Sequence, residues 1–288
     1  MAVTALSLPS RFASLVKLEH TIFALPFAYV GAVLAWDDLP WGQDLLWITV
    51  AMVGARTLAM ALNRLIDAEL DGRNPRTVGR ELPSGTLTSP QVLGLSGVAL
   101  AAFVVAVLQL DPLVRWLWPV PVVMFVVYPY LKRVTWLCHQ WLGASLGLAP
   151  LGAWAAVRGE LPWQAWAVGG AVALWVAGFD LFYSLFDLEH DRAEGLYSWA
   201  TRFGERGVFI AARLHHVAAV ALLALAGLGL DVGLLYWLGL VVVAALLAYE
   251  HSLVRPGDLR RLDAAFFTVN GVISVVFFGF VLLDAIAA

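Results

Sequence analysis

The sequence holds a single cysteine, Cys138, among its 288 residues. One thiol excludes an internal disulfide and a cysteine cluster for a metal ion. Charge is also scarce: charged residues make up only 14% of the chain, hydrophobic residues 61%, and the mean hydropathy is +0.81. This composition indicates a polytopic membrane protein rather than a soluble domain with a large core. In such a protein the net charge of -3 means little as a total. No nucleic acid is expected as a partner, and no protein partner is implied.

Apolar stretches of roughly 20 residues, long enough to cross a bilayer as α-helices, recur along the chain. They lie at 19–37, 45–66, 90–110, 113–131, 136–157, 163–186, 208–230, 233–252 and 264–286. We therefore predict an all-α polytopic membrane protein, a single domain over residues 1–288 with nine transmembrane helices. Residues 1–18 form an N-terminal segment in which Leu8 to Leu18 has the amphipathic pattern of a short interfacial helix.

Basic residues are distributed very unevenly between the two sides of these spans. All but three of the 18 lysines and arginines fall on one side. Arg115 and Arg158 fall on the other side, and Arg56 lies inside a span. Since positive loops stay in the cytoplasm, we expect a protein of the inner (cytoplasmic) membrane with its N-terminus cytoplasmic and its C-terminus outside.

Two sets of polar residues with the same spacing end the second and the sixth span: Asn63, Asp67 and Asp71, then Tyr183, Asp187 and Asp191. A spacing of four places each set on one face of a helix. Four carboxylates at membrane level are costly unless they are compensated. Mg²⁺ prefers oxygen ligands, and it is commonly bound by one or two protein carboxylates together with the phosphates of a substrate. The two aspartate pairs therefore predict a shared Mg²⁺ site, although solvated helix ends paired with arginines are the alternative.

The duplicated spacing also indicates an internal repeat. The second and sixth spans run in the same direction, four spans apart, and each is followed by a basic cytoplasmic loop, at 67–89 and at 187–207. Parallel repeats that meet at a shared site are a known membrane architecture. We expect two parallel four-helix repeats plus one helix, with both loops around one cytoplasm-facing active site.

Basic side chains near this site are candidates for binding an anionic substrate. Lys132 and Arg133 end the fourth span, where they act either as topology signals or as fixed cations for a diphosphate. Lys17, at the end of the interfacial segment, belongs to the same substrate-binding set.

Two charged residues lie deeper, inside spans. Arg56 precedes Asn63 by seven residues on the same face, and Asp180 precedes Asp187 by the same interval. An arginine within the membrane indicates a functional site by default, and here it suits the carboxylate of a substrate. An ion pair between Arg56 and Asp180 is an equally good structural interpretation, and Asp180 is otherwise assigned a hydrogen bond or a role in substrate binding.

The polar segments resemble known motifs. NRLIDAELDGRNPRT resembles the first aspartate-rich motif, NxxxDxxxD, of the UbiA superfamily of intramembrane prenyltransferases, and YSLFDLEHDRAEGLYS resembles the second, YxxxDxxxD. The likeness extends through KLEHTIFALPFAY, RELPSG and YPYLKR, and so through nearly the whole chain. In detail the chain is most similar to bacterial 4-hydroxybenzoate polyprenyltransferases and to the futalosine-route menaquinone branch.

The resemblance implies a UbiA-like helical bundle in which Mg²⁺, held by both motifs, binds polyprenyl diphosphate. Its tail would run into a lipid-facing tunnel, and membrane lipid would surround the protein. The acceptor would be an aromatic carboxylic acid, 4-hydroxybenzoate or 1,4-dihydroxy-6-naphthoate, in ubiquinone or menaquinone biosynthesis. The residues matching metal and diphosphate positions are Asn63, Asp67, Asp71, Asp187 and Asp191, while Lys132 matches a diphosphate-binding lysine and Tyr183 opens the second motif. Arg64 departs from the family, because many members have an acidic residue there.

Two other functions fit a membrane protein with paired acids. A secondary transporter would use such acids to bind coupling ions, but these aspartates lie at helix ends rather than in mid-membrane. A CDP-alcohol phosphotransferase would also need metal, but its DGxxAR…GxxxD pattern is absent. Aromatic prenyl transfer is therefore the function that the sequence favours.

Overall fold

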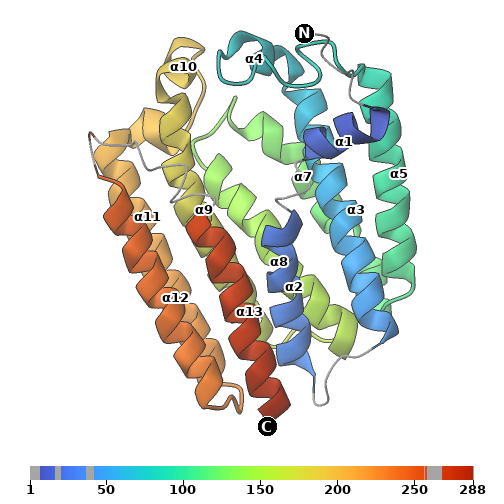
Figure 1. Ribbon diagram of the computed structural model, residues 1–288, viewed down its shortest axis with the longest axis vertical. Helices are drawn as coiled ribbons and strands as arrows, with labels where there is room; N and C mark the ends of the chain where they lie inside the picture. Colours follow the sequence, from blue (N-terminus) through green and yellow to red (C-terminus); the bar gives the residue numbers. More distant parts are fainter. Residues whose placement is uncertain (1–6, 17–20, 37–41, 256, 258–267, 288) are drawn as a thin grey trace.

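The computed structural model describes residues 7–16, 21–36, 42–255, 257 and 268–287. Within these ranges the chain forms a bundle of helices (Figure 1). The helices are α1 (Leu8–Val16), α2 (Thr21–Ala35), α3 (Gln43–Ile66), α4 (Ala68–Arg73), α5 (Ser89–Leu108), α6 (Pro112–Leu117), α7 (Pro119–Leu131), α8 (Cys138–Arg158), α9 (Trp163–Tyr183), α10 (Leu188–Ala193), α11 (Trp199–Leu228), α12 (Leu234–Leu253) and α13 (Asn270–Ala287). A 3₁₀ turn, Ser184–Asp187, joins α9 to α10.

The all-α membrane fold is confirmed. Seven helical segments among the described residues are long and apolar enough to cross a membrane, with α6 and α7 counted together and α9 extended through α10. The apolar helix α2 is shorter, and α8 has 21 residues but is less apolar than the others. In chain order these helices correspond to the expected spans. Large apolar side chains such as Leu214, Val217 and Val241 point out of the bundle and are exposed, as a lipid environment requires.

Three details of the sequence prediction are wrong. The fourth span is not one helix, because α6 ends before Trp118 and α7 begins at Pro119, whose ring cannot continue a regular helix. Each polar stripe was expected on one helix, but the second aspartate of each motif lies on a separate short helix, Asp71 on α4 and Asp191 on α10. The loop expected at 187–207 is largely helical, since it contains α10 and the first turns of α11.

A helix is present over Leu8–Val16, where the sequence predicts a short interfacial helix. Its residues Leu15 and Val16 are buried against Leu87 and Val92 at the start of α5. Arg11 donates to the carbonyl of Thr86 at 3.0 Å, and Ser14 donates to Glu81 at 2.6 Å. α1 therefore holds the connection between α4 and α5 against the bundle.

Helix α9 occupies the centre and packs on α8 and α11, while α3 packs on α5 and α2 on α8. α9 is apolar on all sides, as expected of a helix surrounded by others. α3 and α9 both end at the side of the bundle where α1, α4 and α10 lie, at the top of Figure 1. This common direction brings the two aspartate motifs to the same end.

Glycines allow α8 and α9 to approach closely. A Cβ atom at Gly143 would lie 2.2 Å from the backbone oxygen of Ala173, and one at Gly147 would lie 2.5 Å from that of Gly169. Such small-residue contacts are typical of helix pairs in membranes, where close packing rather than a hydrophobic force holds helices together. The spacing between α8 and α9 is therefore fixed by backbone contact.

We expect Gly143→Ala to lower the thermal unfolding midpoint in lipid nanodiscs, since overpacking costs about 1–3 kcal/mol. Gly152→Ala on the same helix is the control, because a Cβ there meets nothing within 4 Å. An unchanged midpoint for Gly143→Ala would contradict the close approach of α8 and α9.

Candidate active site

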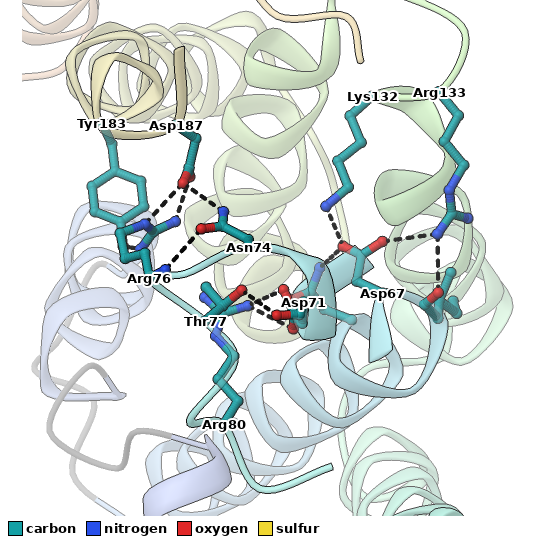
Figure 2. A network of polar contacts seen from close by, with 12 residues as sticks. Asp67, Asp71, Asn74, Arg76, Thr77, Arg80, Lys132, Arg133, Tyr183 and Asp187 are labelled. Carbon is teal, nitrogen blue, oxygen red and sulfur yellow. Dashed lines mark hydrogen bonds and ion pairs between the residues drawn. The ribbon is translucent and has the colours of Figure 1, made fainter. Parts of the chain in front are cut away.

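Asp67 is the most surrounded carboxylate of the site. It is buried, and its side chain receives Lys132 at 2.8 Å, Arg133 at 3.1 Å and the amide of Asn63 at 3.1 Å (Figure 2). Arg133 also donates to the carbonyl of Ile66 at 3.0 Å. Lys132 and Arg133 directly follow α7, and Asp67 directly follows α3. Their ion pairs therefore join the ends of the two helices.

Asp71 is bound by the chain that follows it. Its two carboxylate oxygens each lie 2.7 Å from one guanidinium nitrogen of Arg80, and its backbone oxygen accepts the hydroxyl of Thr77 at 2.9 Å. Both Asp71 and Thr77 are buried. These contacts fold the segment after α4 back over the end of α3.

Asp187 receives side chains from the other half of the protein. Asn74 donates to it at 2.8 Å, and Arg76 binds it through two guanidinium nitrogens, one of them at 2.9 Å. A third nitrogen of Arg76 donates to the hydroxyl of Tyr183 at 2.7 Å. Figure 2 shows this group beside the Asp71 group, with the segment from Asn74 to Arg80 passing between the two aspartate motifs.

A polar cavity of about 300 Å³ lies among these groups. Side chains from both motifs line it, together with basic and aromatic residues, among them Arg56, Asn63, Asp67, Arg76, Arg80, Tyr128, Lys132, His139, Asp180, Tyr183, Asp187 and Asp191. Asp71 is not part of this lining and reaches it only through Arg80. Among the described residues, the Asp191 carboxylate has no hydrogen bond or ion pair, so it is the least compensated acid of the four.

The structure brings together nearly all the residues that the sequence analysis selected. Lys17 lies outside the described residues. Arg56 and Asp180 line the same cavity but form no ion pair with each other in the part of the chain described, since Asp180 is bound to His139 at 2.7 Å. The Nε of Arg56 is buried and has no hydrogen-bond partner there. The structural interpretation of Arg56 as the partner of Asp180 is therefore wrong.

The electrostatics of the site favour an added cation. Burial raises the pKa of the Asp67 carboxyl, although Lys132 and Arg133 act in the opposite direction. Within the described ranges, no three His, Cys, Asp or Glu side chains lie close enough together to hold a metal ion as they stand. The donor set nevertheless fits Mg²⁺, because hard carboxylate oxygens from Asp67, Asp187 and Asp191 face one polar cavity.

Several residues of the site were not selected individually from the sequence. Asn74, Arg76 and Arg80 belong to the basic loop at 67–89, which was expected beside the site but whose side chains were given no individual role. His139 showed no ligand spacing, since its partner lies 41 positions away. Only the fold places these side chains at the aspartates.

A second cavity, of about 340 Å³, adjoins the first and is almost entirely apolar. It is lined by residues of α2, α3 and α5 to α9, with Phe103, Val107, Val114, Leu148 and Trp166 among them. The two cavities share the lining residues Arg56, Ala59, Phe125, Ser145 and Leu146. A polar chamber at the helix ends therefore adjoins an apolar chamber within the bundle.

Comparison with known proteins agrees with this arrangement. The profile of the UbiA prenyltransferase family matches residues 24–272. A 4-hydroxybenzoate octaprenyltransferase of Vibrio campbellii is 32% identical over 92% of this chain and 91% of its own length. A 4-hydroxybenzoate octaprenyltransferase of Cupriavidus necator is 33% identical over 94% of this chain and 95% of its own length.

Solved structures show the same architecture. A UbiA homolog from Aeropyrum pernix K1 superposes with a TM-score of 0.83 at 30% identity, over 92% of this chain and 98% of that one. A UbiA homolog from Archaeoglobus fulgidus bound to DMAPP and Mg²⁺ has a TM-score of 0.74 at 16% identity, over 96% and 100%, which shows a common fold. The matched length and the identity to curated relatives together establish that this chain belongs to the UbiA prenyltransferase family.

Proposed function

We propose that this protein transfers a polyprenyl group from polyprenyl diphosphate to an aromatic hydroxy acid, in the biosynthesis of a respiratory quinone. The observation that carries the proposal is the pair of adjoining cavities, one lined by both aspartate motifs with Lys and Arg, the other apolar. A diphosphate needs the first environment and an isoprenoid chain needs the second. The similarity to two 4-hydroxybenzoate octaprenyltransferases supports the same reaction.

The diphosphate would bind at the polar cavity with Mg²⁺. Asp67, Asp187 and Asp191 would hold the metal directly, with Asp71 and Asn63 supporting them, and the UbiA homolog from Archaeoglobus fulgidus was solved with DMAPP and Mg²⁺. Bound Mg²⁺ would supply positive charge to the leaving diphosphate. Lys132, Arg76 and Arg80 line the same cavity and would add fixed cations beside it.

The isoprenoid chain would extend from the polar cavity into the apolar one. Ala59, Phe125 and Leu146 line both cavities, and the first carbons of the chain would lie beside them. Burial of methylene groups there contributes about 0.8 kcal/mol each. The tail would thereby hold the reacting carbon in a fixed position beside the acceptor.

Ionisation of the allylic C–O bond leaves negative charge on the diphosphate and positive charge on the chain. The basic side chains stabilise the first charge more in the transition state than in the ground state. Tyr128 and Tyr183 line the cavity, and their ring faces would stabilise the second. The electron-rich ring of the acceptor attacks the cation, and loss of a ring proton restores aromaticity.

The acceptor would be recognised at Arg56. Its guanidinium lines both cavities, is buried, and keeps one N–H without a partner among the described residues. Such a group binds a carboxylate through two parallel hydrogen bonds that lysine cannot reproduce. The acceptor is therefore proposed to carry a carboxylate, as 4-hydroxybenzoate and 1,4-dihydroxy-6-naphthoate do.

The protein is a multi-pass membrane protein, and we place its active site on the cytoplasmic side of the inner membrane. The basic residues of the site gather at the end of the bundle where α1, α4 and α10 lie. The excess of Lys and Arg at that end supports a cytoplasmic N-terminus and an external C-terminus. Water-soluble acceptor and diphosphate would then enter and leave on the cytoplasmic side.

If both aspartate motifs hold one metal–diphosphate assembly, Asp67→Asn and Asp191→Asn should each lower turnover at least about 100-fold. The double variant should be little worse than either single variant, because the residues act as a unit. Product formation with polyprenyl diphosphate and 4-hydroxybenzoate, followed by mass spectrometry, measures this. Asp44→Asn, in the first turn of α3 at the other end of the bundle, is the control. Full activity in EDTA would refute the proposed metal dependence.

Arg56→Lys should raise the KM for the acceptor roughly tenfold or more while leaving the KM for the donor nearly unchanged. Loss of a bidentate, charge-assisted pair costs about 1.5–3 kcal/mol. Arg115→Lys is the matched control, because Arg115 lies on α6 and binds the carbonyl of Leu110 at 3.0 Å. An unchanged acceptor KM would show that Arg56 does not anchor the carboxylate.

A further inference from the structure

A buried histidine and aspartate form a pair in the wall of the polar cavity. His139 lies in the first turn of α8 and Asp180 lies in α9, and their Nδ1 and Oδ2 atoms are 2.7 Å apart. His139 is 7% exposed and Asp180 is 9% exposed. Both line the cavity that contains the aspartate motifs. Burial of this depth requires a partner for each group, and the two supply it to one another.

The other ring nitrogen of His139 has no such partner. Its Nε2 is buried and makes no hydrogen bond within the described ranges. In the neutral imidazole that carries its hydrogen on Nδ1, this nitrogen donates to the carboxylate of Asp180. Nε2 then carries the free lone pair, and a buried polar atom left unpaired in this way costs about 1–3 kcal/mol.

The surroundings of this pair match a small hydroxylated aromatic acid. Arg56, Tyr128 and Ser145 line the same cavity, and Arg56 is the proposed carboxylate anchor. Arg56 comes from α3, whereas His139 and Asp180 come from α8 and α9. An acceptor bound by its carboxylate to Arg56 would present its ring and hydroxyl to the other helices of the cavity.

We propose that His139 is the catalytic base that takes the hydroxyl proton of the aromatic acceptor, and that Asp180 is the residue that positions it. This inference rests on the proposed prenyl transfer. Asp180 thereby receives a role distinct from the four motif aspartates. It orients a base, while they bind the metal and diphosphate.

The proton and electron balance is as follows. The acceptor O–H bond breaks, its proton moves to Nε2 of His139, and its electron pair forms a C=O bond as the ring carbon next to it attacks the prenyl carbon. The allylic C–O bond breaks with its electron pair on the diphosphate, so one C–C bond replaces one C–O bond. The attacked ring carbon then loses its hydrogen as a proton, and the oxygen regains a proton from His139. One proton is released overall, and the residue returns to its starting state.

Among the other described histidines, His190 also lines the polar cavity, but none has a carboxylate partner. His216 on α11 and His251 on α12 form a buried pair with Nδ1 and Nε2 3.0 Å apart. Neither lines the polar cavity. His216 is 2% exposed, so it is as deeply buried as His139 and serves as a matched control.

The test compares two acceptors in His139→Gln, which keeps a polar side chain but has no basic nitrogen. With 4-hydroxybenzoate, kcat should fall roughly 100-fold, within the range of general base catalysis. With 2,6-difluoro-4-hydroxybenzoate the hydroxyl is more acidic, and the positions beside it remain free. The ratio of wild-type to variant kcat should then shrink at least about fivefold, because a substrate that loses its proton more readily needs the base less.

Asp180→Asn provides a second variant with the same readout. It should show a smaller loss that also shrinks with the fluorinated acceptor, and the double variant should be no worse than His139→Gln, as expected if Asp180 acts through His139. His216→Gln should show the same wild-type-to-variant ratio with both acceptors. Stabilisation of the folded protein by Mg²⁺ and polyprenyl diphosphate should be unchanged in His139→Gln, because His139 is proposed to contact the acceptor and not the diphosphate.

Equal losses with both acceptors, or undiminished activity of His139→Gln and Asp180→Asn, would overturn the role of His139 while prenyl transfer stands. Absence of any prenylated product from the wild-type protein would instead overturn the proposed function and this inference together. The two failures are therefore distinguishable in one set of assays.

Discussion

The structure depends on compensating negative charge at the end of a membrane bundle. Asp67 and Asp71 are almost fully buried, and Asp187 is partly buried. An uncompensated carboxylate in such a place would cost several kcal/mol. Each of these three is bound by cations that come from elsewhere in the chain: Lys132 and Arg133 from the end of α7, and Arg76 and Arg80 from the segment after α4. The charge pairs therefore determine how the ends of α3, α7 and α9 and the intervening loop are arranged.

The bundle provides the rigid frame for this charged end. Gly143 and Gly147 allow α8 and α9 to pack closely. Gly31 does the same for α2 and α8, since an added Cβ there would lie 2.3 Å from the backbone oxygen of Pro150. Such contacts leave little freedom for these helices to shift. His139 lies on α8 and Asp180 on α9, so the close backbone contacts between these two helices determine their relative position.

The sequence predicted the spans and the two aspartate motifs because both are local patterns. Apolar length identifies a span, and a spacing of four identifies one helical face. It placed the ends of the second and sixth spans at 66 and 186, but it did not predict the short helices α4 and α10 that follow them. The sequence also did not predict which side chains the site residues would contact. Arg76 and Asp187 are 111 positions apart, and His139 and Asp180 are 41 positions apart, so only tertiary packing defines these pairs.

The ion pairs seen here also indicate how the site would accept its charged substrate. A magnesium diphosphate contains a cation and an anion. The cavity wall contains carboxylates that can bind the first and basic side chains that can bind the second. The carboxylates that now bind Lys132 and Arg76 would turn to the metal, and the released ammonium and guanidinium groups would turn to the diphosphate oxygens. The carboxylates and cations that now pair with one another would each exchange one partner for another and stay compensated, which limits the penalty of charge buried in a low-dielectric bundle. Asp191, which has no polar partner among the described residues, would be the first acid to receive the metal, because no existing ion pair has to break.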